Sequence, residues 1–284
     1  MMIDITDEEF NLLKELLCRI SGIDIPANKQ YLFKTRLSSF LRDKGYKGFS
    51  EFYHVMNTAR DGELERTFVQ SMTTHESSFF RDRTPFALLE KRLLPEISAQ
   101  RLKDAVFMPA RIKILSAGCS YGQEAYSIAM CVAKWRKSQQ EDGTISDVAI
   151  QATDISRRVL ERAKKGHYTD LEMGNHMPED FKKEYFIHGE SHWEITDEIR
   201  QMVSFSEMNL SESFGNMGKF DIIFCRNVII YFPIELKAKI VKGFFNALNK
   251  GGALILGSSE NLYRSHEDFE SCSGEGAMYF VPRK

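Results

Sequence analysis

The second half of the chain alternates strand-like and helix-like segments, and this alternation restricts the fold more than any other feature. From Arg111 onward, β-rich runs end in small or polar residues: RIKILSAG, DVAIQATDIS, MVSFSEMNL, FDIIFCRNVII and GGALILGSS. Helical segments separate most of them, among them YGQEAYSIAMCVAKWRK and PIELKAKIVKGFFNALNKGG. Strands that alternate with helices form a parallel sheet with helices on both faces. The sequence therefore predicts an α/β fold for this region.

The first 95 residues or so have a different pattern, which is helical throughout. Thr6 and Glu9 form a capping-box signature, and apolar residues then recur at helical spacing as far as Gly22. A second helix is expected from about Asn28 to Lys44. A third is expected near FSEFYHVMNT and a fourth near GELERTFVQSMT.

These patterns predict three parts. We expect an N-terminal helical domain at 1–75, a linker and connecting helix at 76–95, and a sheet domain at 96–284. Residues 177–201 break the alternation of strand and helix, so a small β subdomain is expected within 177–205.

Charge and cysteine content exclude several classes of protein. The net charge of −2 gives no overall attraction to nucleic acid. The five cysteines include no CxxC pair and lie near no histidine pair at metal spacing, so we expect no metal site and a reducing compartment. The start MMIDITDEEF lacks a signal peptide, and no apolar run reaches the roughly 18 residues of a membrane span. We therefore expect a cytoplasmic protein that does not insert into membranes.

The ends of the first two strands carry residues suited to a ligand. Gly118 and Gly122 form a tight turn before a helix, where the backbone can approach a bound molecule. Asp154 ends the second strand, 36 residues after Gly118 rather than the roughly 20 of the dinucleotide fingerprint. A strand-end carboxylate still suits a ribose, so a nucleoside without pyrophosphate is favoured, and S-adenosylmethionine fits. The alternative is that Gly118 and Gly122 bind no ligand and only allow the helix to pack closely on the strand.

The third and fourth strand ends add polar and apolar groups. Asn209 and Leu210 suit the edge and face of an adenine, and CRNVIIYF follows the fourth strand. Taken singly, Asn209 is better explained as a turn residue and Arg226 as a surface charge. Four consecutive strand ends with fitting groups favour a binding site.

Together these motifs resemble the chemotaxis receptor glutamate O-methyltransferases, the CheR family. The resemblance covers nearly the whole chain and includes TTHESSFFRD, SAGCSYGQEAYSIA, ATDIS, MNL, IIFCRNVIIYF and GGALILGSSENL. It implies a class I, Rossmann-like methyltransferase sheet with an N-terminal all-α domain. It also implies that S-adenosylmethionine is the donor, that S-adenosylhomocysteine is the product, and that methyl esters form on glutamates of chemoreceptor cytoplasmic helices.

The resemblance also assigns site residues. The implied cofactor contacts, with Gly118 from the glycine turn, are His75, Ser77, Arg81, Glu124, Asp154, Asn209, Leu210, Arg226 and Asn227. His75 and Ser77 stand where the family often has asparagine and threonine. A glutamate carboxylate is already ionised at pH 7, so catalysis needs positioning rather than a strong base. We expect Arg81 to orient that carboxylate and Tyr231 to place a hydroxyl beside the methyl group.

The second predicted helix carries a local positive charge. Residues 29–47 hold six Lys or Arg against one Asp, a net +5. At helical spacing Lys34, Ser38 and Arg42 form one stripe, with an apolar stripe beside it. By resemblance, Lys34, Arg36 and Arg42 would bind an acidic receptor helix. A solvated helix face is the alternative.

Two other functions remain open at this stage. One is a methyltransferase for nucleic acid or small molecules, although the fourth strand end lacks the proline pair common in base methylators. The other is a non-catalytic module that binds the donor and signals through partners. The expected partners are receptor helices rather than nucleic acid, and we expect a monomer.

Overall fold

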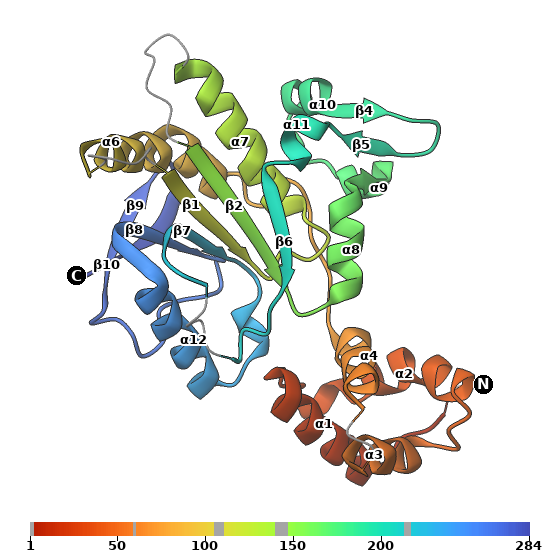
Figure 1. Ribbon diagram of the computed structural model, residues 1–284. Helices are drawn as coiled ribbons and strands as arrows, with labels where there is room; N and C mark the ends of the chain where they lie inside the picture. The colour runs from red at the N-terminus through yellow and green to blue at the C-terminus, as the bar shows by residue number, and fades with distance from the viewer. Residues whose placement is uncertain (1–2, 59–60, 105–110, 140–146, 213–216) are drawn as a thin grey trace.

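The computed structural model describes residues 3–58, 61–104, 111–139, 147–212 and 217–284 (Figure 1). The N-terminal helices lie below the carboxyl ends of the central strands in Figure 1. Their bounds are α1 (Asp7–Ser21), η1 (Ala27–Lys29), α2 (Tyr31–Asp43), α3 (Phe49–Thr58) and α4 (Gly62–Met72). The predicted helices are confirmed, except that the second starts with a separate 3-10 turn, η1.

Local signals set the first helix. The Thr6 hydroxyl accepts a hydrogen bond from the Glu9 backbone while the Glu9 carboxylate accepts one from the Thr6 backbone, so the predicted capping box is confirmed. Gly22 ends α1 with a φ of +79°, a conformation that glycine adopts without strain. Inside the bundle the rings of Phe10 and Phe33 pack edge to face with centroids 5.3 Å apart.

One hydrophobic cluster joins this bundle to the sheet. It contains buried residues of α1–α4 together with Leu115, Ile223 and Leu254 from three strands and Phe244 from α12 (Ile234–Ala247). Neighbouring strand residues Ile114 and Ile222 belong to a second cluster on the opposite face. That alternation is the period of two that a sheet covered on both faces requires.

The central sheet has seven strands in the order β6-β2-β1-β7-β8-β10-β9. Their bounds are β1 (Arg111–Ala117), β2 (Asp147–Asp154), β6 (Val203–Glu207), β7 (Phe220–Cys225), β8 (Leu248–Leu256), β9 (Phe269–Gly274) and β10 (Ala277–Pro282). The five predicted strands are parallel, as expected. Strands β9 and β10 were not predicted. They pair antiparallel, because a two-residue turn with positive φ at Glu275 and Gly276 reverses the chain between them, and β10 also pairs antiparallel with β8.

Helices connect and cover these strands. A single helical run enters the sheet domain as α5 (Thr84–Leu88), the π-helical turn η2 (Leu89–Leu93) and α6 (Leu94–Asp104). The helices α7 (Gln123–Gln139) and α8 (Arg157–Lys165) follow β1 and β2. Figure 1 shows α7 and α12 on opposite faces of the sheet.

A small antiparallel sheet lies beside α8, at one side of the molecule in Figure 1. Its strands are β3 (His167–Tyr168), β5 (Trp193–Ile195) and β4 (Phe186–His188), in that order, with the short helices α9 (Asp170–Met173), α10 (Glu179–Tyr185) and α11 (Asp197–Arg200) around them. The expected β insertion is confirmed, but β3 precedes residue 177 because a two-residue strand carries too little pattern to be recognised.

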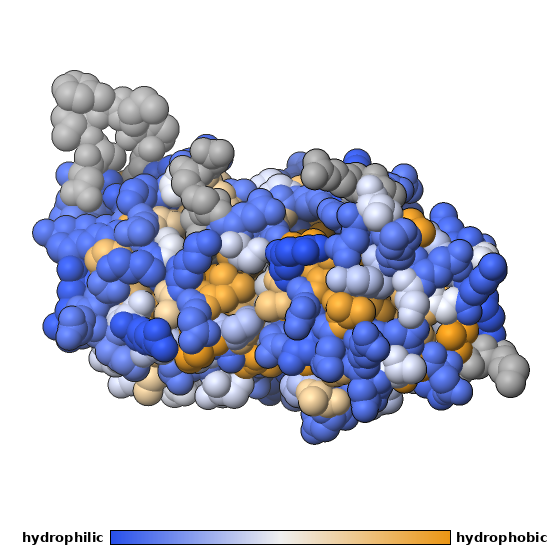
Figure 2. All heavy atoms as spheres, turned by 90° about the horizontal axis from the view of Figure 1, so that it is seen from below, coloured by the Kyte–Doolittle hydropathy of each residue, from blue (hydrophilic) through white to orange (hydrophobic). Residues whose placement is uncertain are grey.

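The surface is mostly polar. Figure 2 views the molecule from below and shows hydrophobic side chains in several recesses between charged and polar ones. Within the described residues, no helix combines the length and the apolar content that a membrane span requires.

Candidate active site

A cleft lies between the carboxyl ends of the parallel strands and the N-terminal helices. It encloses about 1270 Å³, part of it open to solvent. Every predicted cofactor or catalytic residue lines it: His75, Ser77, Arg81, Gly118, Glu124, Asp154, Asn209, Leu210, Arg226, Asn227 and Tyr231. The N-terminal helices contribute residues between Ser21 and Arg36. The cleft thus brings together segments that are far apart in the sequence.

Gly118 sets the floor of the cleft at the end of β1. Its φ is +75°, and a Cβ atom at this position would lie 2.4 Å from Cγ2 of Val228. Its N–H donates to the carbonyl of Thr153 over 2.7 Å, so the end of β1 is tied to the end of β2. Only glycine allows the first turn to approach the segment after β7 this closely.

Asp154 is one of the acidic residues that line the cleft, and it lies at the end of β2. One carboxylate oxygen accepts the N–H of Ser120 over 2.9 Å, and the other accepts the N–H of Ser156 over 2.9 Å. Burial raises the pKa of Asp154, and the backbone hydrogen bonds and nearby His75 offset part of that rise. Each oxygen has a further lone pair with which to accept a ligand hydroxyl.

His75 lies in the segment between α4 and α5. Its Nε2 shares a 2.7 Å hydrogen bond with the Thr73 hydroxyl, and its ring packs edge-on against Tyr121 at 5.7 Å between centroids. Burial lowers the pKa of His75, so the imidazole is neutral near pH 7. It can therefore exchange hydrogen bonds with a ligand without adding a positive charge.

Arg226 is a buried arginine that contacts several other residues of the site. Its guanidinium donates to Glu124 over 3.2 Å, to Asp82 over 2.6 Å and to the carbonyl of Arg81 over 2.8 Å. Burial raises the pKa of Glu124, and the charge of Arg226 opposes that rise. These partners show Arg226 holding the Arg81 segment against α7. Its predicted contact with the cofactor stays a prediction.

The segment that carries Arg81 has strained backbone. Phe80, Asp82 and Arg83 all have positive φ, at 49°, 65° and 36°. Such conformations persist where surrounding contacts fix them. Phe79 and Phe80 supply these contacts: Phe79 packs on Tyr168 at 4.8 Å and Phe80 on Phe86 at 5.2 Å between centroids.

Arg81 itself is the predicted substrate-orienting residue. Its side chain is half-buried on the cleft wall, and Nη1 donates to the carbonyl of Glu76 over 3.4 Å. This hydrogen bond is long and weak, so the guanidinium still has N–H groups with which to bind a carboxylate. The backbone that carries it is fixed by the packing of its neighbours. Asp82, its neighbour and a partner of Arg226, was missed by the sequence argument, although it stands in the quoted motif.

The segment after β7 depends on a carboxylate that the sequence argument also missed. Glu260 is 7% exposed and accepts four backbone N–H groups. Its oxygens bind Asn227 at 2.9 Å, Val228 at 2.9 Å, Ile230 at 3.3 Å and Gly257 at 2.7 Å. The segment braced in this way carries Asn227, with a φ of +60°, and Tyr231, in the turn η3 (Ile229–Tyr231).

Asn209 and Tyr231 also connect the cleft to the N-terminal helices. The Asn209 amide donates to the Ile20 carbonyl over 3.1 Å, and its oxygen accepts the N–H of Ser211 over 3.0 Å. The carbonyl of Tyr231 accepts the N–H of Asp24 over 2.9 Å. The side-chain amide of Asn209 thus already bonds within the junction between the two domains. An adenine contact, as predicted, would have to use the same amide. Leu210 is 6% exposed and provides apolar wall.

The predicted substrate residues on α2 differ in their positions. Arg36 lines the cleft and donates to the carbonyl of Met72 over 2.7 Å. Lys34 pairs with Asp4, and neither Lys34 nor Arg42 lines the cleft. Ser38, expected on the same exposed stripe, is 3% exposed because it lies under the N-terminal segment and accepts the N–H of Ile3. Lys34 and Arg42 therefore do not form one continuous exposed stripe.

Comparison with known proteins finds similar sequences along almost the whole chain. The family model "CheR methyltransferase, all-alpha domain" matches residues 8–73, and "CheR methyltransferase, SAM binding domain" matches residues 75–278. A chemotaxis protein methyltransferase of Vibrio anguillarum is 39% identical over 94% of each chain. Chemotaxis protein methyltransferase 1 of Pseudomonas aeruginosa is 37% identical over 95% of this chain and 97% of its own.

Proposed function

The chain belongs to the CheR methyltransferase family, and from this premise we propose that it forms methyl esters on glutamate side chains of chemoreceptor cytoplasmic helices. Membership makes it a methyltransferase of chemotaxis with a class I fold that uses S-adenosylmethionine. The glutamate, the receptor and the roles of individual residues are the content of the proposal.

The cleft residues fit this cofactor. Asp154 offers acceptors for the ribose hydroxyls, and Leu210 and Ile155 offer apolar surface for the adenine. The Ser120 hydroxyl is buried beside Asp154 and has no hydrogen-bond partner among the residues that the structure describes. A buried hydroxyl of this kind calls for a partner, which a bound ligand would provide.

The single observation that carries the proposal is the position of Arg81. Arg81, on a strained and well-packed segment, lines the same cleft as Asp154, the residue proposed to bind the ribose. An arginine there suits a substrate carboxylate, which its planar donors can hold in one orientation. A neutral amine or hydroxyl substrate would have no use for that charge.

The reaction asks for little proton chemistry from the protein. When bound, S-adenosylmethionine would supply a methyl group from its positively charged sulfur: the carboxylate oxygen would bond to the methyl carbon as the carbon–sulfur bond breaks, and S-adenosylhomocysteine would leave. In this proposal Arg81 orients the carboxylate, and Tyr231, which also lines the cleft, supplies a hydroxyl contact to the reacting region. Residues of the N-terminal helices and of the segment around Arg81 line the same cleft, and their part in the proposal is to limit the access of water to the bound substrate.

The test is transfer of labelled methyl groups to membranes that carry the organism's own chemoreceptors. We expect label in receptor protein, released as methanol by mild alkali because the product is an ester. Alkali-stable label, or label in nucleic acid, would indicate another substrate class. Cofactor binding without any transfer would indicate a non-catalytic module.

Cofactor affinity should fall as the pH falls. Ribose hydroxyls donate to the ionised form of Asp154, and burial raises the pKa of Asp154, so this acceptor is lost at a higher pH than for an exposed aspartate. Binding is therefore complete above the raised pKa and weakens below it. Calorimetry with S-adenosylhomocysteine from about pH 8 down to about pH 5 measures this dependence.

Asp154→Asn is the matched control, since the amide does not titrate. It should bind S-adenosylhomocysteine more weakly at pH 8 and show a shallower pH dependence. An affinity that is constant over the whole range in the wild type would remove Asp154 from the ribose site.

Charge reversal on α2 should impair use of the receptor. The methyl-accepting helix is expected to be acidic, so Lys34→Glu with Arg42→Glu should raise the KM for receptor and flatten its salt dependence. Donor affinity should stay constant because neither residue lines the cleft. Steady-state kinetics at several ionic strengths give both quantities.

The control makes the same charge change elsewhere. Lys103→Glu with Lys250→Glu alters two exposed residues, one on α6 and one at the start of β8, away from the cleft. Its receptor KM should match the wild type. Equal KM values for the two double variants would show that α2 is an ordinary solvated face.

The same proposal includes location and assembly. The methyl-accepting helices are cytoplasmic, and all five cysteines are unpaired in the structure, as a reducing compartment favours. We propose a cytoplasmic monomer that recognises protein helices rather than nucleic acid.

A further inference from the structure

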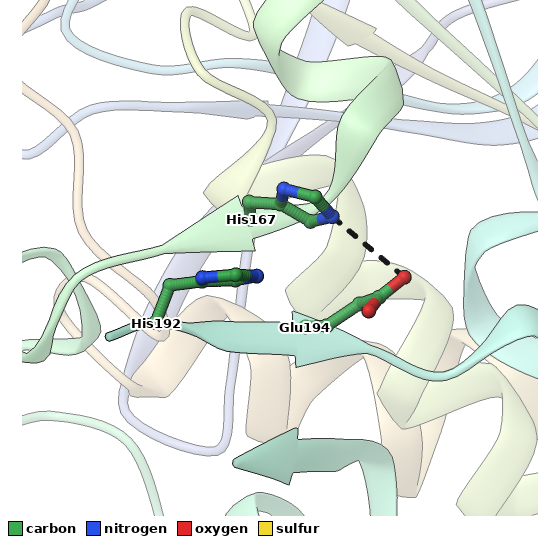
Figure 3. A group of neighbouring side chains, drawn as sticks. All are labelled: His167, His192 and Glu194. Atoms are coloured by element: carbon green, nitrogen blue, oxygen red, sulfur yellow. Dashed lines mark ion pairs between the residues drawn. The ribbon is translucent and has the colours of Figure 1, made fainter. Parts of the chain in front are cut away.

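The small sheet carries three metal-ligand side chains on one face. His167 in β3 pairs directly with Glu194 in β5, and His192 precedes Glu194 by two residues. Residues that pair across strands, or that stand two apart along a strand, share a face. Figure 3 shows the three side chains projecting together from β3 and from β5 with the turn before it.

The ligand atoms are close enough to surround one ion. One ligand atom from each residue lies within 4.8 Å of those of the other two, and Nε2 of His167 is 3.7 Å from an oxygen of Glu194. The two imidazole rings have centroids 4.5 Å apart. Bonds of about 2.0–2.2 Å to zinc require ligand atoms about 3.3–3.5 Å apart. The His167 and Glu194 side chains are about two-fifths exposed, so rotation can supply the remaining approach.

We propose that His167, His192 and Glu194 form a binding site for a divalent transition-metal ion of the Zn²⁺ type. Two imidazoles and one carboxylate are the donors that zinc accepts, with a fourth position left for water. The proposal does not depend on the methyl-transfer proposal. The sequence predicted no metal site, because the cysteines lie near no histidine pair, and His167 and Glu194 come together only through the pairing of β3 with β5.

The surroundings select the kind of metal. A shallow pocket beside the two histidines is also lined by Arg158, Arg162 and Lys165, and by Glu161, which pairs with Lys164. These positive charges oppose Mg²⁺ and Ca²⁺, which bind mainly through charged oxygen ligands. Imidazole nitrogen binds zinc-type ions strongly enough to tolerate such neighbours, and Arg162 is already paired with Glu172.

A metal ion bound here would stabilise the small sheet against which the segment with Arg81 packs. Tyr168, next to His167 in β3, packs on Phe79 at 4.8 Å between centroids, and Phe186 in β4 packs on the same ring at 5.3 Å. Phe79 precedes Arg81 by two residues. Joining β3 to β5 therefore stabilises the surface on which that segment rests.

The test is a Zn²⁺ titration of the tag-free, metal-stripped full chain by calorimetry, with Mg²⁺ as the comparison ion. We expect about one bound Zn²⁺ per chain and no binding of Mg²⁺. His192→Ala and Glu194→Gln should each weaken Zn²⁺ binding by about tenfold or more, a loss typical of disturbed metal sites. Zn²⁺ should also raise the melting temperature of the wild type and not of these variants.

His176→Ala is the matched control, because His176 is an exposed histidine of the same insertion outside the cluster. Its Zn²⁺ affinity should equal that of the wild type. Circular dichroism verifies folding, and Glu194→Gln keeps the side-chain shape if His192→Ala loses structure. No Zn²⁺ binding by the wild type, or equal binding by wild type and both ligand variants, would overturn the proposal.

Discussion

Replacing Arg81 by alanine is expected to lower turnover on receptor by roughly a hundredfold or more, because the substrate carboxylate loses the group that orients it. The loss should appear in kcat more than in the affinity for S-adenosylhomocysteine, since Asp154 and the glycine turn remain. Single-turnover methyl transfer, together with calorimetry of the product, separates the two effects.

Arg83→Ala is the control for this variant. Arg83 is exposed two residues away, has positive φ like its neighbours, and does not line the cleft. Its turnover should lie within a few fold of the wild type. Equal turnover in the two alanine variants would show that Arg81 has no special role in positioning the substrate.

Removing the carboxylate of Glu260 is expected to reduce stability and turnover together. Glu260→Ala leaves four backbone N–H groups without their acceptor, which should lower the free energy of unfolding by about 3 kcal/mol or more. Turnover should fall as well, since these groups fix the segment that carries Asn227 and Tyr231. Urea unfolding and kinetics at a temperature where the variant is folded measure the two losses.

Glu260→Gln and Glu267→Ala sharpen the comparison. The glutamine keeps one acceptor oxygen but presents an NH₂ group to two of the backbone donors, so both losses should be intermediate. Glu267 is exposed nearby, and its removal should change neither quantity. If folded Glu260→Ala turned over at the wild-type rate with unchanged KM, Glu260 would have a structural role only.

Local patterns predicted the parts of the fold that local interactions determine. The Thr6 capping box, the Gly22 end of α1 and the five parallel strands all carry signals within a few residues. Strand β3 was missed because it is only two residues long. The β9-β10 hairpin was missed because no helix separates it from β8, so it lies outside the alternation of strand and helix. Ser38 was misplaced because the N-terminal segment that buries it gives no signal in α2.

The site, like the fold, could be predicted where the pattern lies within a few residues and not where contacts between distant segments decide. Strand ends gather at one edge of a parallel sheet, so Asp154, Asn209 and Arg226 could be expected in one cleft from the sequence. Glu260 could not, since its role depends on backbone groups 30 to 33 residues earlier in the chain. The cluster of His167, His192 and Glu194 likewise exists only through strand pairing.

The central claim is that the accepting group is a receptor glutamate, and mass spectrometry of receptor peptides tests it most directly. After incubation of purified receptor with the enzyme and S-adenosylmethionine, we predict peptides heavier by one methyl group, with fragment ions that place it on glutamate side chains. Alkali should remove the added mass, and Arg81→Ala should leave nearly all of these peptides unmodified. A methyl group on lysine, arginine or another nitrogen, stable to alkali, would contradict the account.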